Sequence, residues 1–81
     1  MANDTNPEVK AAEARRTARN EASLIRKSLS LGWTVIAIDA RDGREYRIVA
    51  ASTKTIDGTT VLLGQEPRQG IWFPVSSWVQ K

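Results

Sequence analysis

The chain has 81 residues, carries a formal net charge of +3 and contains neither cysteine nor histidine. A chain of this length forms at most one domain. The lack of cysteine excludes disulfides and thiolate chemistry and is typical of a reducing compartment, so we expect a cytoplasmic protein. The lack of histidine removes the commonest general acid–base group and transition-metal ligand. No apolar run is long enough to predict a membrane span.

The N-terminal third of the chain predicts one helix. Asn6 and Pro7 are typical of a helix start, with Asn6 as the N-cap and Pro7 at the first helical position. Residues 7–31 contain no further proline and no glycine, and they are rich in alanine, arginine and glutamate, which favour helix. Gly32 is placed to end the helix in a left-handed conformation. Residues 1–6 are polar, and we expect them to be disordered.

Apolar side chains recur in this helix at spacings of three and four, which places them on one face. They are Ala11, Ala14, Ala18, Ala22, Ile25 and Leu29. Alanine offers little apolar area, so we expect only the last two turns to dock firmly on a sheet. The apolar residues of those two turns are Ala22, Leu24, Ile25, Leu29 and Leu31.

The side of the helix away from this stripe is basic. Arg15, Arg19 and Arg26 have no acidic partner at helical spacing. Two interpretations stay open at this point. The arginines either form an ordinary solvated face or form a stripe that contacts phosphates.

The remainder of the chain predicts short strands joined by tight turns. Asp42-Gly43 and Asp57-Gly58 are strong hairpin signals. The expected strands cover residues 33–40, 45–56 with a bend at Ala50-Ala51, 59–65, 71–75 and 78–80, with one short turn at Ser76-Ser77 between the last two. Short turns make neighbouring strands antiparallel. The expected fold class is therefore α+β: an N-terminal helix followed by a small, five-stranded antiparallel, strongly bent β-barrel. The domain division is residues 1–6, then the helix 7–31, then the barrel 32–81.

Three details of these strands carry further expectations. The first strand is apolar on both faces, so we expect the helix to cover the face that does not look into the barrel. In the fourth strand Ile71, Phe73 and Val75 should point inward and Trp72 outward. Pro74 cannot donate to a β-ladder, which places that strand at an edge or ends it there.

This layout resembles the Sm-like family, which includes the bacterial RNA chaperones. The shared pattern covers roughly residues 22–80: a helix, a first strand, an Asp-Gly turn, a long bent strand, and a final segment divided by a short turn. Ala50-Ala51 stands where the family usually has glycine, and Trp72-Phe73-Pro74 stands where bacterial members carry a Lys-His pair that reads RNA. The resemblance therefore implies a fold and transfers no RNA-binding residues. Small barrels of the Src-homology type share the same layout.

Catalytic patterns are absent from the sequence. There is no Ser-His or Cys-His pair and no glycine-rich phosphate motif. Asp39, Asp42 and Asp57 stand at the expected turns, where aspartate favours the turn itself. We expect no enzyme activity, no cofactor and no metal site.

Two function classes remain. The first is binding of RNA or single-stranded DNA through the basic helix and the barrel surface, with phosphate contacts from Arg15, Arg19, Arg26, Arg41, Arg44 and Arg47. Tyr46 or Trp72 would stack on bases. The second is a protein-binding inhibitor or adaptor, of the kind that phages and plasmids encode, which docks through an aromatic patch at Trp72, Pro74 and Trp78. Homo-oligomerisation through the last two strands or the alanine face is a variant of this second class.

Overall fold

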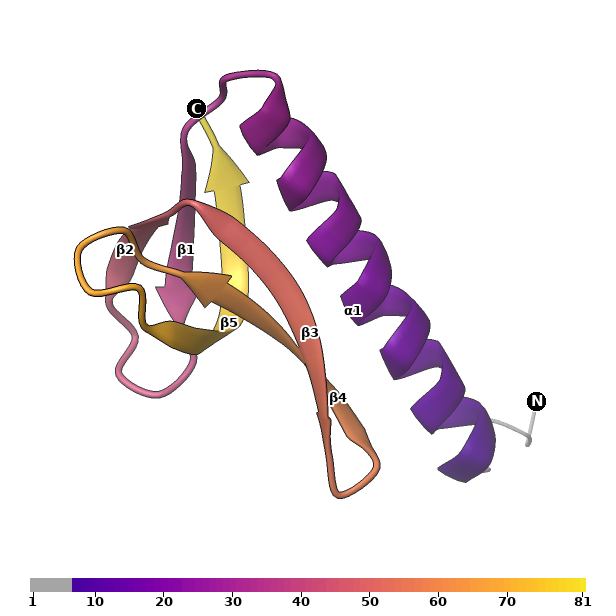
Figure 1. The fold of residues 1–81 in the computed structure, drawn as a ribbon. Helices are drawn as coiled ribbons and strands as arrows, with labels where there is room; N and C mark the ends of the chain where they lie inside the picture. The colour runs from indigo at the N-terminus through magenta and orange to yellow at the C-terminus, as the bar shows by residue number, and fades with distance from the viewer. Residues whose placement is uncertain (1–6) are drawn as a thin grey trace.

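The computed structural model describes residues 7–81, with side chains from Arg15 onward, and shows a helix followed by five strands (Figure 1). Helix α1 spans Pro7–Ser30. The strands are β1 (Val35–Asp39), β2 (Glu45–Ile48), β3 (Ala50–Ile56), β4 (Thr59–Gln65) and β5 (Trp72–Gln80). This order confirms the expected α+β class. The expected N-cap at Asn6 and the expected disorder of residues 1–6 lie outside the described residues, as do the side chains of Ala11 and Ala14.

Helix α1 ends as its sequence predicts. The backbone N–H of Trp33 donates to the carbonyl of Ser28 at 3.0 Å, and that of Gly32 donates to Leu29 at 3.1 Å. Gly32 has φ 88°. This pair of bonds around a left-handed glycine satisfies carbonyls that the last turn would otherwise leave free. The helix is therefore stopped sharply and the chain is redirected into β1.

The five strands form one antiparallel sheet in the order β2-β1-β5-β4-β3. The two hairpins, β1–β2 and β3–β4, lie at opposite ends of this order, and β5 joins them in the middle. Side chains from both halves meet in a single core, so the sheet is folded over on itself (Figure 1). Within residues 7–81 no pairing joins β3 back to β2, and the expected closure into a barrel is not shown.

The long bent strand expected over residues 45–56 is interrupted at Val49. The N–H of Val49 donates to the carbonyl of Gln65 at 2.9 Å, while Ala50 also pairs with Gln65. Two residues therefore oppose one, which is a β-bulge. The extra residue reverses which side chains face inward, so Ala51 is buried and Ala50 only half-buried. The bend lies one residue earlier than the sequence predicts.

The two short strands expected at 71–75 and 78–80 are one continuous strand, β5. Trp72 to Pro74 pair with β4, and Val75 to Gln80 pair with β1, with a register shift where Ile38 faces Ser77 and Asp39 faces Val75. The expected turn at Ser76-Ser77 is thus a bulge at which the strand changes partners.

The edge position expected for Pro74 is wrong, because β5 is the central strand. The carbonyl of Pro74 accepts a bond from the N–H of Ala40 at 2.8 Å, just beyond the end of β1. Pro74 has no N–H with which to return this bond, and the β1–β5 ladder stops here, after the Asp39–Val75 pair.

The helix packs against β3 and β4 (Figure 1). Its Ile25 is fully buried and joins the same core as Val35 and Ala37 of β1. The expectation that the helix covers the second face of β1 is therefore wrong. Ile36 and Ile38, on that face, are half-buried beside β2 and β5.

Some apolar side chains expected in the core are exposed. Leu24 is one residue from Ile25, and a rotation of about 100° carries it off the docked face. It is 53% exposed, and Leu31, beyond the end of the helix, is 66% exposed. Ile71 is also exposed because it precedes β5 rather than lying within it. Phe73 points inward and Trp72 outward, as expected.

Candidate functional site

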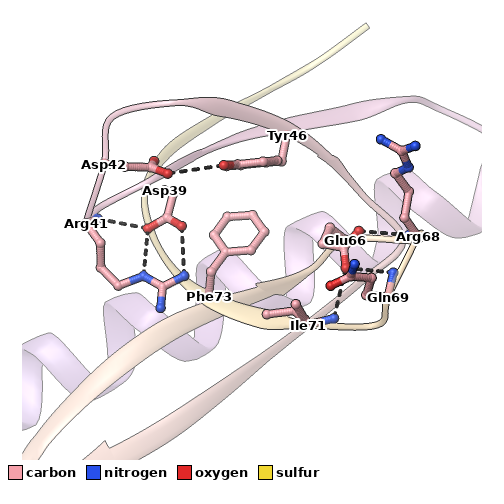
Figure 2. Close-up of a pocket in the computed structure, with 9 residues that line it drawn as sticks. All are labelled: Asp39, Arg41, Asp42, Tyr46, Glu66, Arg68, Gln69, Ile71 and Phe73. Carbon is pink, nitrogen blue, oxygen red and sulfur yellow. Dashed lines mark hydrogen bonds and ion pairs between the residues drawn. The ribbon is translucent and has the colours of Figure 1, made fainter.

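A cleft of about 680 Å³ lies between the β1–β2 turn and the β4–β5 loop (Figure 2). Its lining mixes charged, polar and aromatic side chains: Asp39, Arg41, Asp42, Tyr46, Glu66, Arg68, Gln69, Ile71 and Phe73. Figure 2 shows Arg41 at one side of the cleft, Arg68 at the other, and the ring of Phe73 between them. The carboxyl groups of this lining are the candidates for general acid–base catalysis. The hydrogen-bond partners of each carboxyl group therefore show whether it is available for such a role.

The carboxylate of Asp39 is fully engaged. Its Oδ1 accepts the backbone N–H of Arg41 at 2.8 Å and the Nε of the same residue at 3.1 Å, while Oδ2 accepts Nη2 at 2.9 Å. The hydrogen-bonded Arg41 guanidinium holds the pKa of the Asp39 carboxyl below its usual value, and the carboxylate raises the pKa of Arg41. Asp39 therefore fixes the turn that follows β1, as the sequence predicts for an aspartate at this position.

Glu66 plays the same part on the opposite wall. Its carboxylate accepts the backbone N–H groups of Arg68 at 2.8 Å, Gln69 at 2.9 Å and Ile71 at 3.1 Å. These bonds, that of Ile71 above all, lower the pKa of the Glu66 carboxyl. Glu66 thus holds the β4–β5 loop in shape, a role that no sequence pattern indicated.

Asp42 and Tyr46 complete the hairpin side of the cleft. Asp42 accepts the N–H of Arg44 at 2.9 Å and the hydroxyl of Tyr46 at 3.1 Å, and the second bond raises the pKa of that phenol. The Tyr46 ring packs against Phe73 with centroids 5.3 Å apart. Every acid of the cleft is thus occupied by local structure. Across the described side chains, no three acidic residues gather in a way that would hold a metal ion.

The helix arginines form a second candidate surface. At 100° per residue, Arg15, Arg19 and Arg26 fall within about 40° of one another, on one border of the docked face. The Nη1 of Arg26 lies 3.5 Å from the carbonyl of Ala51 in β3, so this border of the helix faces the end strand of the sheet. We call Arg15, Arg19 and Arg26 the arginine flank.

The single acid of the described helix side chains points away from the arginine flank. The carboxylate of Glu21 accepts a hydrogen bond from Nε1 of Trp78, on the opposite border of the docked face. Within residues 15–81 the Arg41–Asp39 contact is the ion pair that the structure shows, and none involves a helix arginine. The positive charge of the flank is therefore not neutralised by neighbouring side chains of this part of the chain.

The flank leads to a pocket at the C-terminal end of the helix. This pocket has a volume of about 330 Å³ and is lined by Leu29, Gly32, Trp33, Thr34, Arg47, Ile48 and Val49. Arg26 of the flank contacts Ala51, and Val49, which lines the pocket, lies two residues before Ala51 in the chain. The flank and the pocket are therefore neighbours. We call it the Trp33 pocket, because the indole of Trp33 is 48% exposed there.

The hairpin arginines expected to bind nucleic acid do not stay together. Arg47 lines the Trp33 pocket. Arg41 and Arg44 lie in the turn at the far end of β1 and β2, among the carboxylates of Asp39 and Asp42. The structure therefore joins Arg47 to the helix end and separates it from Arg41 and Arg44.

The expected aromatic patch is not formed as one surface. Trp72 pairs with Gln65 on the outer face of the sheet, whereas Trp78 pairs with Ala37, a core residue, and bonds to the helix. The bulge at Ser76 places these two indoles on opposite faces. Pro74 shares the outer face with Leu63.

Trp33 is not among the site residues predicted from the sequence, because the pattern of apolar residues placed it inside the first strand. The signal that could have identified it is the adjacent Gly32, because the residue directly after a helix-ending glycine donates its N–H back to the last helical turn and so belongs to the helix end rather than to a β-ladder.

Comparisons with known proteins gave no match: no family model, no curated protein and no solved structure resembles the chain closely enough to indicate a relationship. No helix in the described part of the chain has the length and apolar character needed to cross a bilayer.

Proposed function

We propose that this protein binds nucleic acid through the arginine flank and the adjoining Trp33 pocket. The observation that carries the proposal is the arginine flank, which no acidic side chain of residues 15–81 neutralises, together with the exposed indole of Trp33 in a pocket two residues along the chain from the Arg26 contact at Ala51. Guanidinium groups contact phosphates and aromatic rings stack on bases, and the two together are the usual elements of such a surface.

The spacing of the arginines suits a polyanion. Arg15 and Arg26 are separated by about 16 Å of helix axis at 1.5 Å per residue. A row of charges over that length matches a repeating ligand better than a single small anion. Arg19 and Arg26 are exposed and Arg15 is half-buried, so the row is accessible along its length.

A protein partner has less support. A docking site for a protein is normally centred on a contiguous apolar patch with aromatic anchors. Trp72 and Trp78 lie on opposite faces of the sheet, and the indole of Trp78 is already bonded to Glu21. The alternative of an inhibitor or adaptor would therefore have to use Trp72 without Trp78.

The test compares two charge-matched double variants of the helix. Arg15→Ala with Arg19→Ala removes two charges from the flank, and Arg16→Ala with Lys27→Ala removes two from the side of the helix facing away from the sheet. We expect the first pair to weaken binding of a fluorescein-labelled mixed-sequence oligonucleotide at least tenfold and the second pair no more than threefold. The affinity of the wild-type protein should fall steeply with added salt because counterions are released.

Equal losses in the two double variants would overturn the assignment of the flank. Absence of salt-dependent binding to RNA, single-stranded DNA and duplex DNA would overturn the proposed function itself. Circular dichroism of each variant checks that the helix is retained.

A further inference from the structure

We infer, on the basis of the proposed function, that the ligand is a single strand and that the Trp33 pocket holds one unpaired base. The shape of the pocket, the exposure of its indole and the sign of the charge around it all favour a single unpaired base at Trp33.

The pocket has the size and walls for one ring system. Its volume of about 330 Å³ is at the lower end of the usual range for small-ligand sites, roughly 300–1,000 Å³. Trp33 and Val49, which both line it, are about half exposed, whereas Ile48 in the same lining is buried. The indole of Trp33 and the side chain of Val49 are the apolar surfaces on which a flat ring gains contact area, and indoles stack well on nucleobases.

The electrostatics separate the base from the phosphates. The pocket lies at the C-terminal end of α1, where the helix dipole is negative and disfavours an anion. Arg47 lines the pocket, and Arg26 contacts the carbonyl of Ala51, two residues beyond Val49, so positive charge is found at the border. A neutral base inside the pocket is compatible with the negative helix end, and phosphates at the border are compatible with the positive charge of the arginines.

A duplex does not fit this arrangement. In a double helix each base is stacked between its neighbours and paired along its edge, so an indole cannot cover its face without extruding it at a cost of a few kcal/mol. A single strand presents the face of an unpaired base at little cost. The backbone of Trp33 is held by its bond to Ser28, so its position at the helix end is fixed before the ligand arrives.

The experiment measures fluorescence anisotropy of a labelled six-nucleotide DNA, the RNA of the same sequence, and the duplex of that DNA. We expect the single strands to bind at least tenfold more tightly than the duplex. Trp33→Ala should weaken single-strand binding about tenfold and leave duplex binding unchanged, and Trp33→Phe should recover most of the loss. Trp72→Ala is the matched control, because Trp72 is exposed to a similar extent but lies on the outer face of β4 and β5.

The outcomes distinguish this inference from the proposed function. Duplex binding as tight as single-strand binding, with Trp33→Ala neutral and the flank variants still impaired, would overturn the inference and leave the proposed function standing. Unchanged binding in both the flank and the Trp33 variants, or no binding to any oligonucleotide, would overturn both. Thermal denaturation of Trp33→Ala and Trp33→Phe checks that a loss of affinity is not a loss of fold.

Discussion

The indole Nε1 of Trp78 donates a hydrogen bond to the carboxylate of Glu21, and this bond joins the last strand to the middle of the helix. Trp78 packs against the core, and Ala18 and Ala22, on either side of Glu21 along the helix, are buried. The bond thus fixes the rotation of the helix on the sheet. It also sets which helix border faces β5 and which carries the arginine flank.

We expect Trp78→Phe and Glu21→Ala each to destabilise the protein by about 1.5–3 kcal/mol, because hydrogen bonds to charged groups contribute in this range. Urea unfolding followed by circular dichroism measures the change. The double variant should lose little more than either single variant, since both remove the same bond. Strictly additive losses would show that the two side chains act independently. Glu45→Ala, at an exposed position of β2, is the control.

Gly64 is required by packing rather than by backbone conformation. A Cβ at this position would lie 3.0 Å from Cγ2 and 3.2 Å from Cδ1 of Ile48, and 3.2 Å from Cγ2 of Val75. We expect Gly64→Ala to cost about 1–3 kcal/mol, as overpacking of a filled core does. Adding Ile48→Val removes one of the crowding methyl groups, so the substitution at Gly64 should cost less in that background. A cost at Gly64 that is the same in both backgrounds would contradict this account.

The protein should lose stability in acid through Asp39 and Glu66. Both carboxyl groups have folded-state pKa values below their ordinary ones, Asp39 through Arg41 and Glu66 through backbone N–H groups. A lowered pKa adds stability that is complete above the unfolded pKa and disappears as pH falls through the folded one. The urea midpoint should therefore be constant from pH 7 to about 5 and fall below about pH 4.

Asp39→Asn and Glu66→Gln test which carboxyl group carries this dependence. Each variant should be less stable than the wild type at pH 7 and should show a shallower decrease toward acid pH. A wild-type midpoint that stays level down to about pH 3 would contradict the prediction.

Local signals in the sequence predicted the helix, its end and one strand correctly, whereas long-range pairing determines where the other strands are interrupted or joined. Gly32 marks the helix end, and residues 59–65 form a strand with the predicted bounds. The bulge at Val49 depends on the carbonyl of Gln65, sixteen residues along the chain, and no local pattern indicates it. A bulge reverses the face to which the following side chains point. Ala51 therefore points inward, whereas regular alternation from Ile48 would have placed Ala50 there.

The candidate site was predictable only where it depends on local spacing, and not where it depends on long-range pairing. Helical spacing groups Arg15, Arg19 and Arg26 together, as predicted, but they lie on one border of the docked face, where Arg26 contacts β3, rather than on the side of the helix away from the sheet. The spatial grouping of Trp33 with Arg47 requires knowledge of how β2 pairs with β1 and where the helix stops. The bulge at Ser76 likewise separates Trp72 from Trp78, although their spacing suggests a common face.

The two Asp-Gly turns differ in a way that mutation can measure. At the β3–β4 turn Asp57 has φ 51° and Gly58 φ 78°, so both central residues are left-handed, as a two-residue hairpin requires. At the longer β1–β2 turn only Gly43 is left-handed, with φ 74°. Its N–H donates to the carbonyl of Asp39 at 2.8 Å. A Cβ added at either glycine would meet no atom within 4 Å, so the cost of substitution is conformational.

Gly43→Ala and Gly58→Ala should therefore each cost about 1 kcal/mol, the penalty for a Cβ in the left-handed region. Asp57→Gly should be neutral or slightly stabilising, because it relieves the same penalty at a non-glycine residue. Asp42→Gly, at a residue without positive φ, should destabilise, since it also removes the bonds to Arg44 and Tyr46. Chemical denaturation of the four variants measures these differences. A loss of stability in Asp57→Gly together with a neutral Asp42→Gly would contradict this account of both turns.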